Sequence, residues 1–401
     1  MKAENFRTFS ARHLAVGLAG YCAFINLYSP QSILPLLSEE FGAGAAETSM
    51  VITVSTLAVA VTAPFTGAVA DVLGRKRVIV VAMFLLVVPT LMIAMASTLP
   101  ELIFWRAMQG LVLPPIFAVT VAYIGDEWRP QEATTAAGIY SSGSSLGGFS
   151  GRLVTGLLAD LIGWRAGFAA LASVALAGAV IVGFLLPHER RFVRSEGVLA
   201  SARQMLRHFR NRQLVATYAV GFGVLSNFIC TFTFVSFHLA APPYNLSASW
   251  LGAIFTVYLV GSVLTPWTGW AVGRFGLRRF MAAVIAVWIC GITLTLASSL
   301  PIIIIGLAVG AGCGLICQAV STGYVTITAK SGRSSAVGLY VTSFYLGGSF
   351  GAAVGAIAWN FGGWAACVGL VAVVLAVMAM IVVLAWSDTP RQERRTPVEP
   401  A

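Results

Sequence analysis

Two arginines within long apolar segments are the residues of this sequence with the clearest chemical potential. Arg106 opens the run Arg106–Gly110, and Arg152 closes the glycine-rich run Gly143–Arg152. A charge within such a segment is costly, by about 2.5–3.5 kcal/mol on membrane-insertion scales, and it normally has a function. Because a guanidinium stays protonated in a protein, Arg152 should attract an acidic or strongly hydrogen-bonding group. We therefore predict a solute-binding site that contains Arg106 and Arg152.

Each arginine also has a structural alternative. Arg106 could extend to the nearer membrane surface, where Glu101 lies close enough in sequence to help neutralise it. Arg152 should share a helix face with Ser145, whose hydroxyl could accept a hydrogen bond, and Asp160 lies about two helical turns further on. A pair between Arg152 and Asp160 would give the arginine a structural role, and this alternative stays open.

Aromatic and polar side chains on other segments are candidates for the same site. The first apolar segment presents four of them within about 80° on one helix face, namely Tyr21, Phe24, Tyr28 and Gln31. Phe232 and Tyr340 belong to two later segments that are also rich in aromatic residues. Such a lining would suit an amphipathic organic substrate, and ordinary helix packing is the alternative for each residue.

Carboxylates buried within a span carry the proton in many proton-coupled exporters. Here the acidic residues near the apolar segments fall at the segment ends, namely Asp71, Glu101, Asp126, Glu127 and Asp160. A proton-coupled mechanism would therefore depend on one of these carboxylates or on His238. The cysteines and histidines show no metal-binding spacing, so we expect neither a metal nor another cofactor.

The elements that position these residues are segments long enough to cross a bilayer as helices. Hydrophobic residues make up 58% of the 401-residue chain and charged residues 10%, whereas soluble domains have about 25% charged residues. We predict an all-α membrane protein with twelve transmembrane helices. The predicted spans are 14–37, 48–70, 77–97, 100–125, 133–159, 164–186, 213–239, 249–272, 279–298, 301–325, 334–357 and 363–386.

An internal repeat divides these spans into two pseudo-symmetric six-helix bundles. Residues of the first half recur 200 positions later, as in Gly147-Gly148 and Gly347-Gly348, or Gly163-Trp164 and Gly363-Trp364. The counterpart of Arg152 is Ala352, which favours a functional role for the charge. The predicted organisation is an N-terminal bundle over 1–186, a cytoplasmic basic linker over 187–212, a C-terminal bundle over 213–386 and a cytoplasmic tail over 387–401.

The net charge of +10 is distributed by topology. Most lysines and arginines occupy the two termini and every second loop, whereas the opposite loops contain Glu39, Glu40, Glu47, Glu101 and Asp160. This positive-inside pattern predicts that both termini are cytoplasmic. It argues against nucleic-acid binding and places the chain in a bacterial inner membrane, in contact with the lipid bilayer.

One inter-helix loop has a distinctive sequence. The run Gly67–Arg77 contains Asp71, Gly74 and the basic triplet Arg75-Lys76-Arg77. It resembles the signature loop of the major facilitator superfamily, G-x-x-x-D-x-x-G-R-[KR]-[KR], which in that family latches the two halves in the outward-open state. The resemblance implies a gating role for Gly67, Asp71, Gly74, Arg75, Lys76 and Arg77. The second copy, Gly269–Arg279, has Gly273 at the acidic position.

Two further runs resemble motifs of the same superfamily. Arg106–Gly110 is similar to the R-x-x-Q-G motif of proton-coupled members, and Gly143–Arg152 resembles the antiporter motif G-P-x-x-G-G, with Ser144 in place of proline. The glycines Gly143, Gly147, Gly148 and Gly151 are expected to allow close helix packing. The run also matches G-x-S-x-G, but a hydrolase elbow needs a strand, a turn and a helix.

The resemblance implies a transporter of the drug/proton antiporter branch, which includes arabinose-efflux-like permeases. Our first hypothesis is a proton-coupled exporter of a small drug-like or metabolite molecule that works by alternating access. The alternative is an anion or zwitterion exchanger or symporter that uses Arg106 and Arg152. A membrane enzyme is disfavoured because Walker, H-E-x-x-H and nucleophile motifs are absent from the sequence. We expect a monomer.

Overall fold

The structure is a computed structural model that describes residues 2–189, 207–329 and 333–387. Residues 190–206 of the predicted linker and 388–401 of the predicted tail lie outside the described residues. The first half contains α1 (Lys2–Leu27), η1 (Ser29–Ser32), α2 (Leu34–Glu40), α3 (Ala45–Leu73), α4 (Arg75–Met95), α5 (Leu99–Glu127), α6 (Pro130–Ile162) and α7 (Trp164–Leu185). Here η denotes a 3₁₀ helix. Every regular element of the described part is helical, as predicted.

The second half repeats this pattern with more interruptions. It contains α9 (Arg212–Ala240), α10 (Ala248–Ile254), η2 (Phe255–Val257), α11 (Tyr258–Leu264), η3 (Thr265–Trp267), α12 (Thr268–Phe275), α13 (Leu277–Leu294), α14 (Leu300–Thr328) and α15 (Arg333–Ala385). The elements from α10 to α12 follow one another without a gap and form the predicted eighth span. The backbone of α15 breaks at Gly362 and Gly363, where φ of Gly363 is +61°, so α15 contains the last two spans.

These elements account for the twelve predicted spans, with one clear difference in the first. Nine helices in the described ranges are long and apolar enough to cross a membrane, with α15 counted once and the more polar α1 and α6 not among them. The first span was predicted as one continuous helix over 14–37. In the structure α1 ends at Leu27, and the rest of the span consists of η1 and α2. Pro30 at the start of η1 and Pro35 at the start of α2 explain the break.

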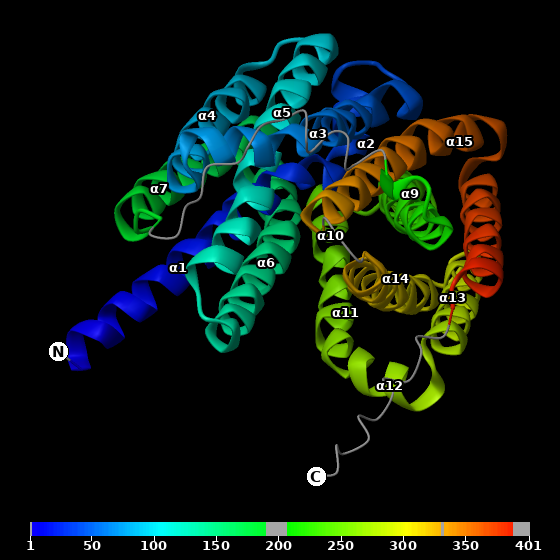
Figure 1. Ribbon diagram of the computed structural model, residues 1–401. Coiled ribbons are helices and arrows are strands. Elements are labelled where there is room, and N and C mark those ends of the chain that lie inside the picture. Colours follow the sequence, from blue (N-terminus) through cyan, green and yellow to red (C-terminus); the bar gives the residue numbers. More distant parts are fainter. Residues whose placement is uncertain (1, 190–206, 330–332, 388–401) are drawn as a thin grey trace, which may run out of the picture.

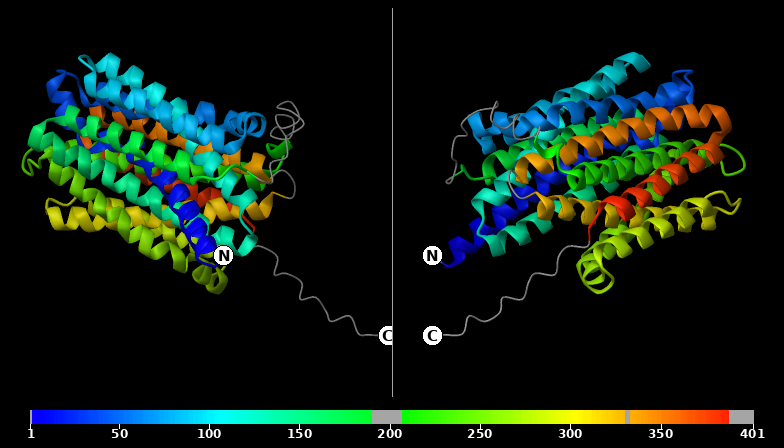
Figure 2. Two further views of the ribbon diagram at one scale, coloured as in Figure 1. Left: turned by 90° about the vertical axis from the view of Figure 1, so that its left-hand side faces the viewer. Right: turned by 45° about the vertical axis from the view of Figure 1, so that its right-hand side comes forward.

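The helices of each half pack mainly on one another, and the two halves lie on opposite sides of the molecule (Figure 1). In the first half, α1 packs on α6, and α5 packs on α3 and α4. In the second half, α15 packs on α9, and α13 packs on α14. The helices of both halves run roughly side by side along one direction (Figure 2). The halves meet where α3 contacts α15 and α6 contacts α10.

The two ends of the helix bundle differ in charge. We call the end with Glu40, Glu101 and Asp160 the acidic end, and the end where Arg75 begins α4 the basic end. At the basic end, Gly74 joins α3 to α4 with a φ of +91°. This backbone conformation is unfavourable for residues other than glycine. The predicted loop between the second and third spans is therefore a single-residue turn.

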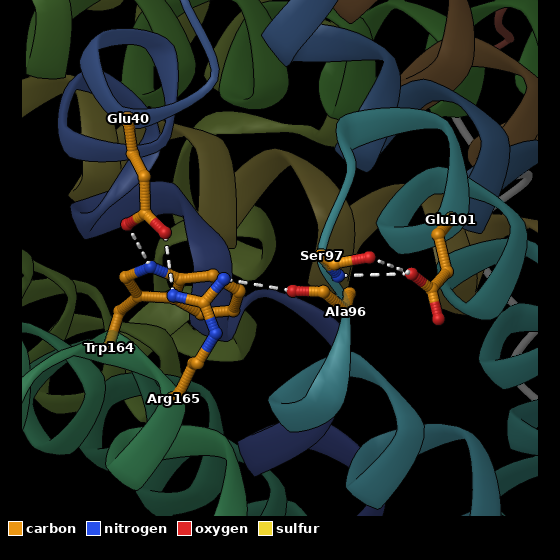
Figure 3. Close-up of polar contacts among 6 residues, drawn as sticks. All are labelled: Glu40, Ala96, Ser97, Glu101, Trp164 and Arg165. Carbon is orange, nitrogen blue, oxygen red and sulfur yellow. Dashed lines mark hydrogen bonds and ion pairs between the residues drawn. The ribbon is translucent and has the colours of Figure 1, made fainter.

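An ion pair at the acidic end joins the end of α2 to the start of α7, both in the first half (Figure 3). Arg165 Nη1 lies 2.6 Å from Glu40 Oε1, and its Nη2 donates to the carbonyl oxygen of Ala96 at 2.9 Å. The indole of Trp164 also donates to Glu40. A cavity of about 680 Å³ opens beside this network, and neither arginine of the predicted site lines it. The network therefore stabilises the end of the first half.

The two halves contact each other at the acidic end and in the middle of the bundle. The hydroxyl groups of Thr56 and Ser349 lie 2.9 Å apart, and the rings of Phe117 and Tyr345 stack at 5.7 Å. Near the acidic end α6 packs closely on α10, whereas further towards the basic end it packs only sparsely on α11. A methyl group built at Gly138, an exposed position of α6, would meet no neighbouring element within 4 Å. The contact between α6 and the eighth span is therefore denser near the acidic end than towards the basic end.

Candidate binding site

The guanidinium of Arg152 lies between the two halves and is almost completely buried, with 4% of the residue exposed. Its Nε donates to Oε1 of Gln31 at 2.8 Å, and its Nη1 donates to the carbonyl oxygen of Gly148 at 2.6 Å. Gln31 belongs to η1, so the break in the first span brings its amide to α6. The Nε2 of Gln31 in turn donates to the hydroxyl of Thr233 on α9, at 3.3 Å, which extends the network into the second half.

Three aromatic rings surround the same guanidinium. The Cζ of Arg152 lies 4.8 Å from the ring centre of Tyr28, 4.5 Å from that of Phe255 and 5.1 Å from that of Tyr258. Phe232 packs behind them, with its ring centre 4.6 Å from that of Tyr258. Ring faces attract a cation within about 6 Å. The first half thus inserts a positive charge into an aromatic cage, Tyr28, Phe255 and Tyr258, that comes mostly from the second half.

This buried charge has no carboxylate partner among the residues that the structure describes. The ion pairs found there join Arg75 to Asp71 and Asp126, and Arg165 to Glu40. Asp160, the alternative partner predicted for Arg152, instead accepts a hydrogen bond from the backbone N–H of Ser249 at 2.9 Å.

The hydrogen bonds of Arg152 occupy only part of its donor capacity. Nε and Nη1 have acceptors, whereas Nη2 has none within the described ranges. The ring faces contact the plane of the guanidinium and cannot accept an in-plane hydrogen bond in the manner of a carboxylate. An anion that approached the free edge of the guanidinium, at Nη2, could therefore bind Arg152 without displacing Gln31.

Arg106 has a different environment, although it is also fully buried. Its Nε donates to the carbonyl oxygen of Val51 at 3.2 Å, and its Nη1 donates to that of Asn26 at 3.0 Å. It also donates to the carbonyl oxygen of Leu27 and the side chain of Gln109. These acceptors include the last carbonyls of α1, so the guanidinium satisfies backbone groups that the end of a helix leaves unpaired.

The geometry of Arg106 favours an anchoring role over substrate binding. Gln109 continues the network by donating to Thr90 Oγ1 at 2.8 Å and to Asn26 Oδ1 at 3.3 Å. The alternative in which Arg106 extends to the membrane surface near Glu101 does not fit, because Arg106 is 0% exposed. Glu101 instead accepts from the backbone N–H of Ser97 at 3.0 Å (Figure 3).

The other predicted site residues divide into two groups. Tyr28, Gln31 and Phe232 gather around Arg152, as described above. Tyr21 accepts a hydrogen bond from Ser150 at 3.1 Å, Tyr340 lies 2.8 Å from the hydroxyl of Ser321, and Ser145 is exposed. Nothing in the described contacts links these three to the guanidinium. The expected serine acceptor is replaced by Gln31 and the carbonyl oxygen of Gly148.

Two residues of the cage were not among the predicted site residues, namely Phe255 and Tyr258. They are three positions apart in the eighth span, so a helix would present both on one face. That spacing was the available signal. Phe255 begins η2 and Tyr258 begins α11, so the cage coincides with a local change in helix geometry. A 3₁₀ stretch within a helix often marks a functional hinge.

The loop at the basic end forms a charged cluster within the first half. Arg75 pairs with Asp71 at 3.7 Å and also with Asp126 at the end of α5. The backbone N–H of Lys76 lies 3.4 Å from a carboxylate oxygen of Glu189. Gly67 lies in open space, and Arg77 is exposed. Asp71 is thus paired with Arg75 of α4 and lies in the part of α3 nearest the basic end.

The glycine stripe of α6 packs directly on the backbone of α1. A methyl group built at Gly143, Gly147 or Gly151 would overlap the carbonyl oxygen of Gly17, Tyr21 or Ile25 respectively. Gly148 lies off this line and faces Arg152. The repeat reproduces the arrangement, because Gly347 and Gly351 contact Phe222 and Ser226 of α9 in the same way. Close packing of this kind fixes α6, and therefore Arg152, relative to η1.

Comparison with known proteins agrees with this architecture. The family model described as Major Facilitator Superfamily matches residues 16–255 and 224–401. The inner membrane transport protein YnfM of Escherichia coli strain K12 is 32% identical over 372 residues, covering 92% of this chain and 88% of the relative. An uncharacterized transporter of Buchnera aphidicola subsp. Schizaphis graminum is 27% identical over 94% of this chain and 91% of its own.

A solved structure of similar shape supports the fold alone. The structure of a mutant of the nucleoside transporter NupG superposes with a TM-score of 0.77 at 15% identity. The match covers 94% of this chain and 100% of that one. The predicted all-α membrane fold with two six-helix halves is therefore confirmed.

Proposed function

This chain belongs to the major facilitator superfamily and is a multi-pass membrane transporter rather than an enzyme, and we propose that its substrate is a small organic anion. The anion binds the free edge of the Arg152 guanidinium between the two halves. The apolar part of the molecule rests against the aromatic cage of Tyr28, Phe255 and Tyr258.

One observation carries this proposal, which is the absence of a carboxylate beside Arg152 in the described part of the chain. Burying an unpaired charge is expensive, and cation–π contacts offset only part of that cost, at about 0.5–2 kcal/mol each. A bound carboxylate or sulfonate would supply the missing counter-charge. A paired guanidinium also forms charge-assisted hydrogen bonds about twice as strong as neutral ones.

Alternating access follows from the arrangement of the two halves. In the present conformation the acidic end is closed, and a solute would reach Arg152 from the more open basic end. Opening the acidic end requires α10 and α11 to move away from α6, which withdraws Phe255 and Tyr258 from the guanidinium. Arg152 would then face the acidic end and could release or capture its anion there.

Proton-coupled export of a drug-like molecule is the second candidate. Its support is the similarity of Arg106–Gly110 and Gly143–Arg152 to motifs of proton-coupled transporters. Arg106, however, is engaged with the chain's own carbonyl oxygens. The described carboxylates lie towards the helix ends, so a coupled proton would have to use one of those or His238. On the basis of the similarity to motifs of proton-coupled transporters, we propose protons as the coupling ion.

The proposed membrane placement follows the charge distribution. We infer a bacterial inner membrane, consistent with the name of the Escherichia coli relative, with the basic end in the cytoplasm. Both termini would then be cytoplasmic. The bundle bounds 1–186 and 213–386 and the monomeric state belong to the same proposal.

Uptake by proteoliposomes tests the proposal. Radiolabelled organic anions, amines and neutral sugars are supplied at equal concentration, with and without a pH gradient. We expect saturable uptake of an anion, and loss of that uptake in Arg152→Gln, which keeps a polar hydrogen-bonding side chain but removes the charge. Uptake of an amine or a neutral drug that survives Arg152→Gln would contradict the anion proposal and favour the second candidate.

A further inference from the structure

A carboxylate of the first half binds the start of a helix in the second half at the acidic end. Asp160, in the last turn of α6, accepts a hydrogen bond from the backbone N–H of Ser249, the second residue of α10, at 2.9 Å. The hydroxyl of Ser249 donates to the carbonyl oxygen of Gly156 on α6, at 3.4 Å. Ser247, which precedes α10, makes no capping hydrogen bond with its side chain. Asp160 therefore caps this helix from another part of the chain.

Two glycines allow the helices to approach closely enough for this bond. A methyl group at Gly156 of α6 would overlap the carbonyl oxygen of Ala248 on α10. A methyl group at Gly252 of α10 would lie 2.7 Å from the carbonyl oxygen of Arg152. The crossing of α6 and α10 is thus a backbone-to-backbone contact between the halves. It lies between the aromatic cage and Asp160.

We propose that Asp160 is a gating residue that holds the acidic end closed by capping the eighth span across the interface between the halves. The first N–H groups of a helix lack partners within the helix, and a carboxylate there is further favoured by the helix dipole. When the acidic end opens, the eighth span must separate from α6 and loses this cap. The bond therefore exists in one transport state only and biases the equilibrium towards closure.

This inference goes beyond the proposed function, because it holds whatever the substrate is. Asp160 is exposed and takes no part in the Arg152 site. Its substitution should change how often the acidic end opens, not how the closed molecule folds. Losing a cap should raise the ratio of open to closed molecules about fivefold. The amide oxygen introduced by Asp160→Asn would still accept the bond, so this variant should behave like the original protein.

Distance measurements between spin labels at the acidic end test the proposal without any substrate. Cysteines replace Glu39 of the first half and Ser298 of the second, which are both exposed, in a background where the exposed Cys290 is replaced by serine. We expect Asp160→Ala to increase the long-distance population about fivefold, and Asp160→Asn to keep it within about twofold. Gly156→Ala, which forces the crossing apart, should shift the population in the same direction.

Glu101→Ala is the matched control. Glu101 is also a carboxylate at the acidic end, but its hydrogen bonds to Ser97 stay within the first half (Figure 3). It should leave the distances unchanged. An unchanged distance distribution in folded Asp160→Ala would overturn the proposal. An equal shift in Asp160→Asn and Asp160→Ala would also overturn it, because the charge and not the cap would then matter.

Discussion

Arg152 on α6 and Tyr258 on α11 come from different halves, and the guanidinium carbon lies 5.1 Å from the centre of the tyrosine ring. The contact depends on the positive charge, because a ring face attracts cations. An anion that pairs with Arg152 weakens this attraction. Substrate binding and the contact between the two halves are therefore coupled through the Arg152 side chain.

The first prediction concerns Arg106 as an anchor. Arg106→Ala should lower the stability of the purified protein by about 3 kcal/mol or more, because each buried polar group left without a partner costs about 1–3 kcal/mol. The groups left would include the carbonyl oxygens of Asn26 and Val51. Thermal unfolding in detergent measures the loss. A normal melting temperature together with abolished transport would show that Arg106 binds substrate after all.

The second prediction concerns the packing of α6 on α1. Gly147→Ala places a methyl group against the carbonyl oxygen of Tyr21 and should destabilise the protein by about 1–3 kcal/mol. Gly138→Ala on the same helix is the control. A methyl group at that position would meet no atom of a neighbouring element within 4 Å, and alanine favours a helix over glycine by about 1 kcal/mol. Equal melting temperatures for the two variants would contradict the packing role.

The third prediction concerns the charged loop at the basic end. Asp71→Asn weakens the pair with Arg75 and should slow transport without abolishing substrate binding. It should also reduce the population in which the basic end is closed. Labels at Gly67 on α3 and Gly338 on α15 report on that end, and both positions have open space around them. Unchanged distances and an unchanged rate would exclude a gating role for Asp71.

The fold was predictable from the sequence because lipid imposes strong rules on it. Long apolar runs must be helical, and the repeat, with pairs such as Gly147 and Gly347, required two similar halves. The break after Leu27 was missed because apolar length was given more weight than Pro30 and Pro35. Local composition does not distinguish a kinked span from a straight one.

The site was predictable only in part. Arg152 stood out because a charge in an apolar span is rare, but the same reasoning gave equal weight to Arg106. The difference between them lies in the surroundings, since Arg106 meets backbone carbonyl oxygens and Arg152 meets rings. Phe255 and Tyr258 are ordinary residues of an apolar helix until the tertiary fold brings them to the guanidinium. Such long-range contacts are not encoded in the spacing of one segment.

Ligand-dependent melting of the purified protein tests the anion site most directly, because a ligand that binds only the folded state must raise the melting temperature. A panel of organic anions, amines and sugars is compared on the original protein, Arg152→Lys, Arg152→Ala and Tyr258→Phe. Tyr258→Phe keeps the ring and serves as the matched control. Lysine retains the charge but lacks the planar two-pronged geometry of arginine.

We expect at least one organic anion to raise the melting temperature of the original protein and of Tyr258→Phe. The shift should be smaller in Arg152→Lys and absent in Arg152→Ala, which should itself fold, because Ala352 occupies the equivalent position of the second half. An anion that stabilises Arg152→Ala as much as the original protein would contradict a substrate site at Arg152.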